Sequence, residues 1–168
     1  PPPNPYRTVE GWLAPSSRAL GSVSMVDVAA DSSLWIAERC GENNCLGRDE
    51  IAPILHVDRD GTWRGAFGAG LFAWPHGIYV DPEGNIWATD ARGGEGRGFQ
   101  VIKLSPEGDV LMRLGTAGEP GDSPRHFSGP TDVVVATSGA VFVSDGHELE
   151  SNNRILKFGR DGTFIKSW

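Results

Sequence analysis

The feature that most constrains the fold of this chain is a unit that occurs three times along it. The clearest copy, residues 72–90, reads F-A-W-P-H-G-I-Y-V-D-P-E-G-N-I-W-A-T-D. A shift of 55 residues aligns Gly84 with Gly139 and Asp90 with Asp145, and a shift of 52 aligns an upstream copy. A repeat of this length indicates a solenoid or a propeller, in which each unit buries its apolar face against the next.

Each copy predicts four short antiparallel strands. The D-P-E-G-N turn at residues 81–85 separates two apolar runs, because proline presets a turn dihedral and glycine accepts positive φ. A second hairpin follows in every copy, at residues 54–63, 101–110 and 155–164, where β-branched and aromatic residues alternate with polar ones. We find no pattern for a helix of about 10 residues or more.

Four strands per repeat predict an all-β fold of the β-propeller type. The blades are expected at about residues 23–67, 72–115 and 127–168, after an extended Pro-rich lead-in at residues 1–5. Residues 6–12 are expected to form a strand that closes the last blade. Propellers close with about 4 to 8 blades, so we expect the remaining blades, or another chain, to complete the disk.

Composition narrows the classes of partner. The net charge is −7 and basic residues form no cluster, which argues against a nucleic-acid partner. No apolar run approaches the roughly 20 residues of a membrane helix. Cys40 and Cys45 lack the further ligands that a zinc site needs, so we expect a local disulfide, with free thiols as the alternative.

The topology predicts that five chemically interesting residues converge on one face of the disk. In a four-stranded meander, the start of the first strand and the end of the second lie on the same face. The residues placed there are Arg39, His76, Asp90, Asp145 and His147. The long inserts at residues 91–98 and 148–153 emerge on this face as well, and loops on a rigid scaffold commonly carry binding.

Each of these residues also has a purely structural interpretation. His76 is either a metal ligand or a hydrogen-bonded structural histidine. Asp90 and Asp145 are expected to accept backbone N–H bonds from neighbouring turns. Arg39 near the axis requires either a paired carboxylate or a bound anion. His56 and His126 are expected to serve packing, and the G-G-E-G-R-G run opens no helix and therefore fails as a phosphate loop.

Three stretches carry a resemblance to a known family: P-H-G-I-Y-V-D-P-E-G-N-I-W-A-T-D, R-H-F-S-G-P-T-D-V and V-F-V-S-D-G-H. They resemble the NHL-repeat propellers and, more narrowly, the peptidyl-α-hydroxyglycine α-amidating lyases (peptidylamidoglycolate lyases). This resemblance implies a six-bladed propeller with a central zinc held by three histidines and a calcium held partly by backbone carbonyls. It also implies cleavage of a carbinolamide C–N bond to give a peptide amide and glyoxylate.

The resemblance assigns roles to individual positions. His76 matches the first zinc ligand, and the carbonyls of Val26 and Ile78 match calcium ligands. Arg39 matches an arginine that binds the substrate's carboxylate, which suits a bidentate guanidinium. His147 stands where the family's D-G-Y motif has its tyrosine base, so a histidine replaces that tyrosine. The other two zinc histidines are expected in later blades, beyond Trp168.

Three functions compete at this point. The first is a metal-dependent lyase acting on a peptide or small-molecule substrate, with Arg39 and His147 in the catalytic site. The second is a non-catalytic NHL propeller that binds a peptide or another ligand. The third, a calcium-dependent lactonase, would need an acidic cage, for which Asp90 and Asp145 are the candidates. The family resemblance and the cysteine pair favour an extracellular or periplasmic location.

Overall fold

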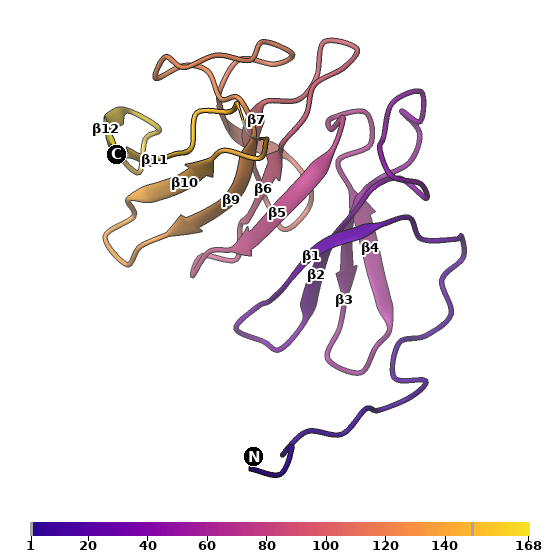
Figure 1. The fold of residues 1–168 in the computed structure, drawn as a ribbon. Helices are drawn as coiled ribbons and strands as arrows, with labels where there is room; N and C mark the ends of the chain where they lie inside the picture. Colours follow the sequence, from indigo (N-terminus) through magenta and orange to yellow (C-terminus); the bar gives the residue numbers. More distant parts are fainter. Residues whose placement is uncertain (1, 149) are drawn as a thin grey trace.

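The computed structural model describes residues 2–148 and 150–168, which form three four-stranded antiparallel sheets without a helix (Figure 1). The first sheet contains β1 (Val23–Val28), β2 (Leu34–Glu38), β3 (Ile54–Val57) and β4 (Trp63–Phe67). The second contains β5 (Pro75–Val80), β6 (Ile86–Asp90), β7 (Gln100–Leu104) and β8 (Val110–Leu114). The third contains β9 (Pro130–Val135), β10 (Val141–Asp145), β11 (Arg154–Phe158) and β12 (Phe164–Ser167). The all-β propeller architecture predicted from the repeat is confirmed.

Every sheet is a meander in which strands adjacent in sequence are adjacent in space. We call the sheets blade one, blade two and blade three, and β1, β5 and β9 are their inner strands. These inner strands lie beside one another, β1 against β5 and β5 against β9. The hairpin glycines Gly84 and Gly139 adopt φ of 85° and 83°, the conformation that the turn pattern required.

The N-terminal segment is an extended trace that runs away from the sheets (Figure 1). Among described residues 2–22 none is in a strand, so the strand expected at residues 6–12 does not form here. A strand needs a neighbour for its backbone hydrogen bonds, and the blade expected to pair with it is not among the three present. The indole nitrogen of Trp12 instead donates to the carbonyl of Arg59 at 3.3 Å.

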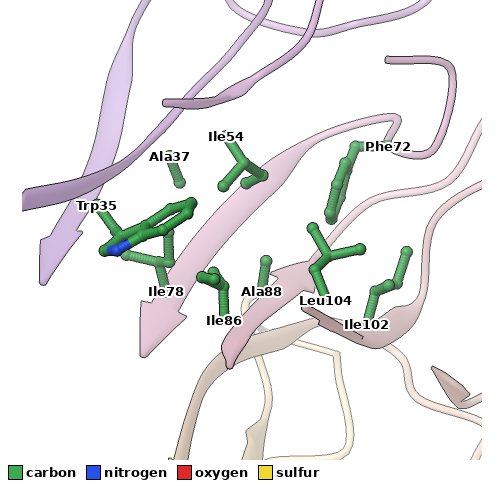
Figure 2. Close-up of a cluster of buried hydrophobic side chains, with 9 residues drawn as sticks. All are labelled: Trp35, Ala37, Ile54, Phe72, Ile78, Ile86, Ala88, Ile102 and Leu104. Carbon is green, nitrogen blue, oxygen red and sulfur yellow. The ribbon is translucent and has the colours of Figure 1, made fainter. Parts of the chain in front are cut away.

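One apolar core lies between blade one and blade two. Figure 2 shows Trp35, Ala37 and Ile54 of blade one facing the side chains of blade two. A second core fills the space between blades two and three. Its buried members are Trp87, Val101, Leu114, Phe127, Val133, Val141, Val143, Leu156 and Phe158.

Blade two is covered on both faces, which explains its composition. Ile86 packs toward blade one and the adjacent Trp87 packs toward blade three, so all five residues of β6 are buried. The equivalent strand β10 alternates between buried and half-buried residues.

Polar bonds between neighbouring inner strands fix the register of the blades. The backbone N–H of Val80 donates to the carboxylate of Asp27 at 2.7 Å, and the hydroxyl of Tyr79 donates to the carbonyl of Val135 at 3.2 Å.

The described residues contain no helix long and apolar enough to cross a membrane.

Candidate functional site

The strand register places the predicted residues on one face, which we call the site face. Pro75 at the start of β5 pairs with Asp90 at the end of β6, and Pro130 pairs with Asp145 in the same way. Val23 pairs with Glu38 in blade one. The loops that precede the inner strands and those that follow the second strands therefore share this face.

The acidic residues at the ends of the second strands are structural anchors. Asp90 is fully buried and accepts hydrogen bonds from the backbone N–H groups of Ala73 and Trp74 at 2.8 and 2.5 Å. Asp145 accepts in the same way from Ser128 and Gly129, at 2.8 and 2.9 Å. Each carboxylate thus fastens the loop that leads into the inner strand of its blade, as the sequence predicted.

Glu38 is the third member of this set, because the 52-residue shift places it on Asp90. Its buried carboxylate accepts from the backbone N–H groups of Gly21 and Gly41 at 2.8 and 2.9 Å, and from Arg18 at 2.6 Å.

Burial raises the pKa of the Asp90 carboxyl above its ordinary value, to about 7. Within the described residues, no three His, Cys, Asp or Glu side chains are grouped so that they could hold a metal. Asp90 and Asp145, the candidates for the acidic cage of the lactonase hypothesis, instead accept backbone N–H bonds.

His76 is oriented by the neighbouring blade. Its Nδ1 lies 2.9 Å from the carbonyl oxygen of Thr131 in β9. Because a carbonyl can only accept, the proton is on Nδ1 and the Nε2 lone pair is available. Gly77 makes this approach possible, since a Cβ there would lie 2.6 Å from the same oxygen. Burial, ahead of the nearby charges of His147 and Arg39, lowers the pKa of His76.

Trp74 is the centre of the site, and the sequence reasoning did not single it out. The guanidinium carbon of Arg39 lies 3.5 Å from its ring centroid, and that of Arg92 lies 4.3 Å away. The ring centroids of His147 and His76 lie 5.0 and 5.4 Å from that of Trp74, and 5.1 Å from each other. The structure therefore brings Arg39, His76 and His147 together around one indole.

Arg39 is held by neutral partners. Its Nε donates to the carbonyl of Pro75 at 3.2 Å and its Nη1 donates to the side-chain oxygen of Asn43 at 2.7 Å. In the described part of the chain no carboxylate lies within ion-pairing distance of it. Burial and, after it, the charge of Arg92 lower the pKa of Arg39. A half-buried cation without a counter-ion attracts an anion.

The loop that follows Arg39 is closed by the Cys40–Cys45 disulfide, which confirms the pairing expected from the sequence. Both cysteines are buried. The backbone N–H of Cys45 donates to the carbonyl of Ala73 at 2.9 Å, which ties this loop to the residue before Trp74.

His147 belongs to a short chain of polar contacts. Its Nδ1 lies 3.1 Å from a carboxylate oxygen of Glu148, and the same oxygen lies 2.5 Å from Nη2 of Arg92. A carboxylate accepts only, so the neutral ring of His147 carries its proton on Nδ1 and has a lone pair on Nε2.

The donor atoms present are compatible with part of a zinc site. His76 donates its Nδ1 proton to a backbone carbonyl, which is the second contact that metal-binding histidines commonly make. His147 presents a second imidazole beside it. Zinc takes three or four protein ligands, so these two leave at least one to come from elsewhere.

The carbonyls of Val26 and Ile78 lie on the open side of their strands. Ala29 and Asp81 donate to Ser33 and Asn85 across their hairpins. Because bonded and non-bonded pairs alternate in antiparallel sheets, the Val26–Ile36 and Ile78–Ala88 pairs are non-bonded ones. The polar backbone groups of both residues therefore point away from the second strand, as a shared cation on the axis would require.

Arg92 and Glu148 were also missed by sequence reasoning. The repeat itself carried a signal for Arg92, because the 55-residue shift places it on His147. Glu148 carried no such signal, since its side chain is exposed and its position lies in an insert.

Comparisons with known proteins show what the chain is similar to. No protein-family profile matches the chain. A probable peptidyl-alpha-hydroxyglycine alpha-amidating lyase from Caenorhabditis elegans is 38% identical, across 95% of this chain and 47% of its own length. Peptidylglycine alpha-amidating monooxygenase from Rattus norvegicus is 45% identical, across 73% of this chain and 12% of its own length.

The chain is a homologue of the amidating lyases. It spans less than half the length of these curated relatives. NHL repeat-containing protein 3 from Homo sapiens is also similar, at 30% identity over 97% of this chain and 45% of its own length. Among solved structures, streptogramin B lyase superimposes with a TM-score of 0.61 at 19% identity, over 89% of this chain and 41% of its own length. This last likeness shows the propeller fold alone.

Proposed function

We propose that this chain is part of a zinc-dependent lyase that cleaves peptidyl-α-hydroxyglycine to a peptide amide and glyoxylate. The observation that carries the proposal is the cluster around Trp74. It combines the guanidinium of Arg39, which no carboxylate of the described residues pairs with, and two imidazoles whose Nε2 lone pairs are available, on His76 and His147. The similarity to proteins named as amidating lyases supports the same reaction.

In this proposal Arg39 binds the carboxylate of the hydroxyglycine residue and orients its α-carbon toward the two histidines. His147 accepts the proton of the α-hydroxyl through Nε2. The C–O bond becomes the carbonyl of glyoxylate as the C–N bond breaks, and the amide nitrogen takes up one proton. Glu148 holds the ring of His147 in the required tautomer.

We also propose that the complete protein holds a zinc ion and a calcium ion. His76 would supply one ligand of the zinc ion, with the other ligands from blades outside this chain. A bound zinc ion would supply Lewis-acid polarisation of the substrate's oxygen. The carbonyls of Val26 and Ile78 would contribute to a calcium site on the axis, where oxygen ligands suit a hard cation.

Two measurements on the protein that carries this chain test the proposal. Glyoxylate release from an α-hydroxyglycine peptide tests the reaction. Zinc content by elemental analysis tests the ligand, with His76→Ala expected to lose zinc and His126→Ala, on an unrelated loop, expected to retain it. Unchanged zinc in His76→Ala would refute the assignment of this ligand.

A second candidate function is a non-catalytic propeller that binds a peptide. The similarity to NHL repeat-containing protein 3 favours it, as does the histidine at the position of the family's tyrosine. Binding of a peptide without turnover in a zinc-loaded sample would select this candidate.

We further propose that the disk is completed by the remaining blades or another chain, and that the protein works in an extracellular or periplasmic compartment. The exposed apolar side chains of Ile155, Ile165 and Trp168 on blade three support a covering neighbour. The Cys40–Cys45 disulfide fits an oxidising compartment.

A further inference from the structure

A cavity of about 230 Å³ lies beside the Trp74 cluster and takes no part in the proposed reaction. It lies between two loops of the site face, residues 39–49 after β2 and residues 91–99 after β6. Its lining consists of Asn43, Asn44, Leu46, Ala73, Trp74, Arg92 and Gly93.

The two loops are fastened to each other, so the cavity has a fixed wall. The side chain of Leu46 fills the space that a Cβ on Gly94 would occupy, with a separation of 2.8 Å. The backbone N–H of Gly47 donates to the carboxylate of Glu95 at 3.2 Å. Arg97, whose side chain is mostly buried, donates to Asp49 at 2.7 Å. Together with the disulfide, these contacts preorganise the wall.

The lining presents hydrogen-bond donors. The side-chain oxygen of Asn43 is occupied by Arg39, and that of Asn44 accepts from the backbone N–H of Leu46 at 2.9 Å. The amide NH₂ groups of both asparagines are left to face other partners, and Arg92, whose Nη2 is paired with Glu148, adds its remaining guanidinium N–H groups as donors. No carboxylate is among the lining residues. Such a lining suits a group that accepts hydrogen bonds and carries a small apolar part.

Trp74 connects this cavity to the proposed carboxylate site, because its indole lines the cavity and also carries the guanidinium of Arg39. The volume is below the roughly 300–1,000 Å³ of pockets for drug-sized ligands, so it fits about one amino-acid residue. A ligand whose carboxylate is on Arg39 would extend its preceding residue past Trp74 toward the cavity.

We propose that this cavity is a subsite for the residue that precedes the terminal carboxylate-bearing unit of the substrate, and that Asn44 and Arg92 bind the acyl carbonyl attached to the nitrogen of that residue, a carbonyl that N-acetylalanylglycine has and N-acetylglycine lacks. The proposal rests on the carboxylate role of Arg39 in the proposed function. It makes the length of the acyl part, rather than the carboxylate alone, a determinant of affinity.

The test uses two unreactive probes, N-acetylglycine and N-acetylalanylglycine, with dissociation constants measured by calorimetry. The wild-type protein should bind the longer probe about tenfold more tightly, the equivalent of one or two net hydrogen bonds. Asn44→Asp keeps an oxygen for the Leu46 N–H and replaces the donor with a carboxylate, so it should abolish this preference. Arg92→Gln should reduce it to about twofold.

Control variants separate this proposal from the proposed function. Arg39→Gln should weaken the binding of both probes by a similar factor. Arg125 is an exposed arginine on another loop, so Arg125→Gln should change neither dissociation constant. Equal affinities for the two probes in the wild type, or an unchanged preference in Asn44→Asp, would overturn the subsite. A preference that follows these variants in a protein without lyase turnover would retain the subsite and remove the reaction.

Discussion

Replacing the buried Asp145 should destabilise the fold far more than replacing an exposed aspartate does. Its carboxylate accepts four hydrogen bonds. Two come from the backbone N–H groups described above, and two come from side chains, from the amide NH₂ of Asn152 at 2.7 Å and from Nε of Arg154 at 3.0 Å. Removing one partner of a buried ion pair costs about 3–5 kcal/mol. Arg154 also donates to backbone carbonyls, which offsets part of that loss. We therefore expect about 3–4 kcal/mol for Asp145→Ala.

Asp145→Asn provides a finer test, because it preserves shape and one acceptor oxygen. That oxygen can still accept from the backbone N–H groups of Ser128 and Gly129, but the new NH₂ group faces the donors of Asn152 and Arg154. An unsatisfied or opposed donor costs about 1–3 kcal/mol, so this variant should lose about 2 kcal/mol.

Urea unfolding followed by tryptophan fluorescence measures both losses. Asp60→Asn is the matched control, since its carboxylate is exposed and such changes stay within about 0.5 kcal/mol. The double variant Asp145→Ala/Arg154→Met should lose less stability than the sum of the losses in the two single variants. A loss below about 1 kcal/mol in Asp145→Ala would refute the anchoring role.

Three further predictions follow from the packing. Replacing Cys40 and Cys45 with alanine removes a link across 5 residues and should cost about 2 kcal/mol from loop entropy; an unchanged urea midpoint would contradict this. Burial lowers the pKa of His56, which stacks on an indole at 4.1 Å. The neutral His56 ring therefore contributes stability that is present above about pH 6.5 and is lost as the pH falls below it. In His56→Gln the free energy of unfolding should change less between pH 7.5 and about 5 than in the wild type, and an equal change in both proteins would count against this role of His56. Gly77→Ala places a methyl group 2.6 Å from the carbonyl of Thr131 and should cost about 1–3 kcal/mol in unfolding free energy; a neutral result would show that β5 and β9 can separate freely.

The fold was predictable because the repeat and its turns are local signals. The D-P-E-G-N turn and the 55-residue shift identified strands and blades, and the shared face followed from the meander topology. The site was predictable only where a residue sat at a strand end, as with His76 and His147. Trp74 could not be recognised from the sequence, because its contacts with Arg39 and Arg92 arise from three separate loops. The strand at residues 6–12 depends on a partner outside the three blades, which no local pattern supplies.

The buried acid at the end of each second strand has a consequence for how such proteins diversify. Glu38, Asp90 and Asp145 clamp the roots of the loops from inside the sheet, so a loop can lengthen or change composition beyond its root while the strands beneath stay in place. The inserts at residues 39–49 and 91–99 contact each other, so they would be exchanged as a pair. Grafting both from a relative with another ligand preference should transfer that preference and leave the melting temperature of the scaffold nearly constant.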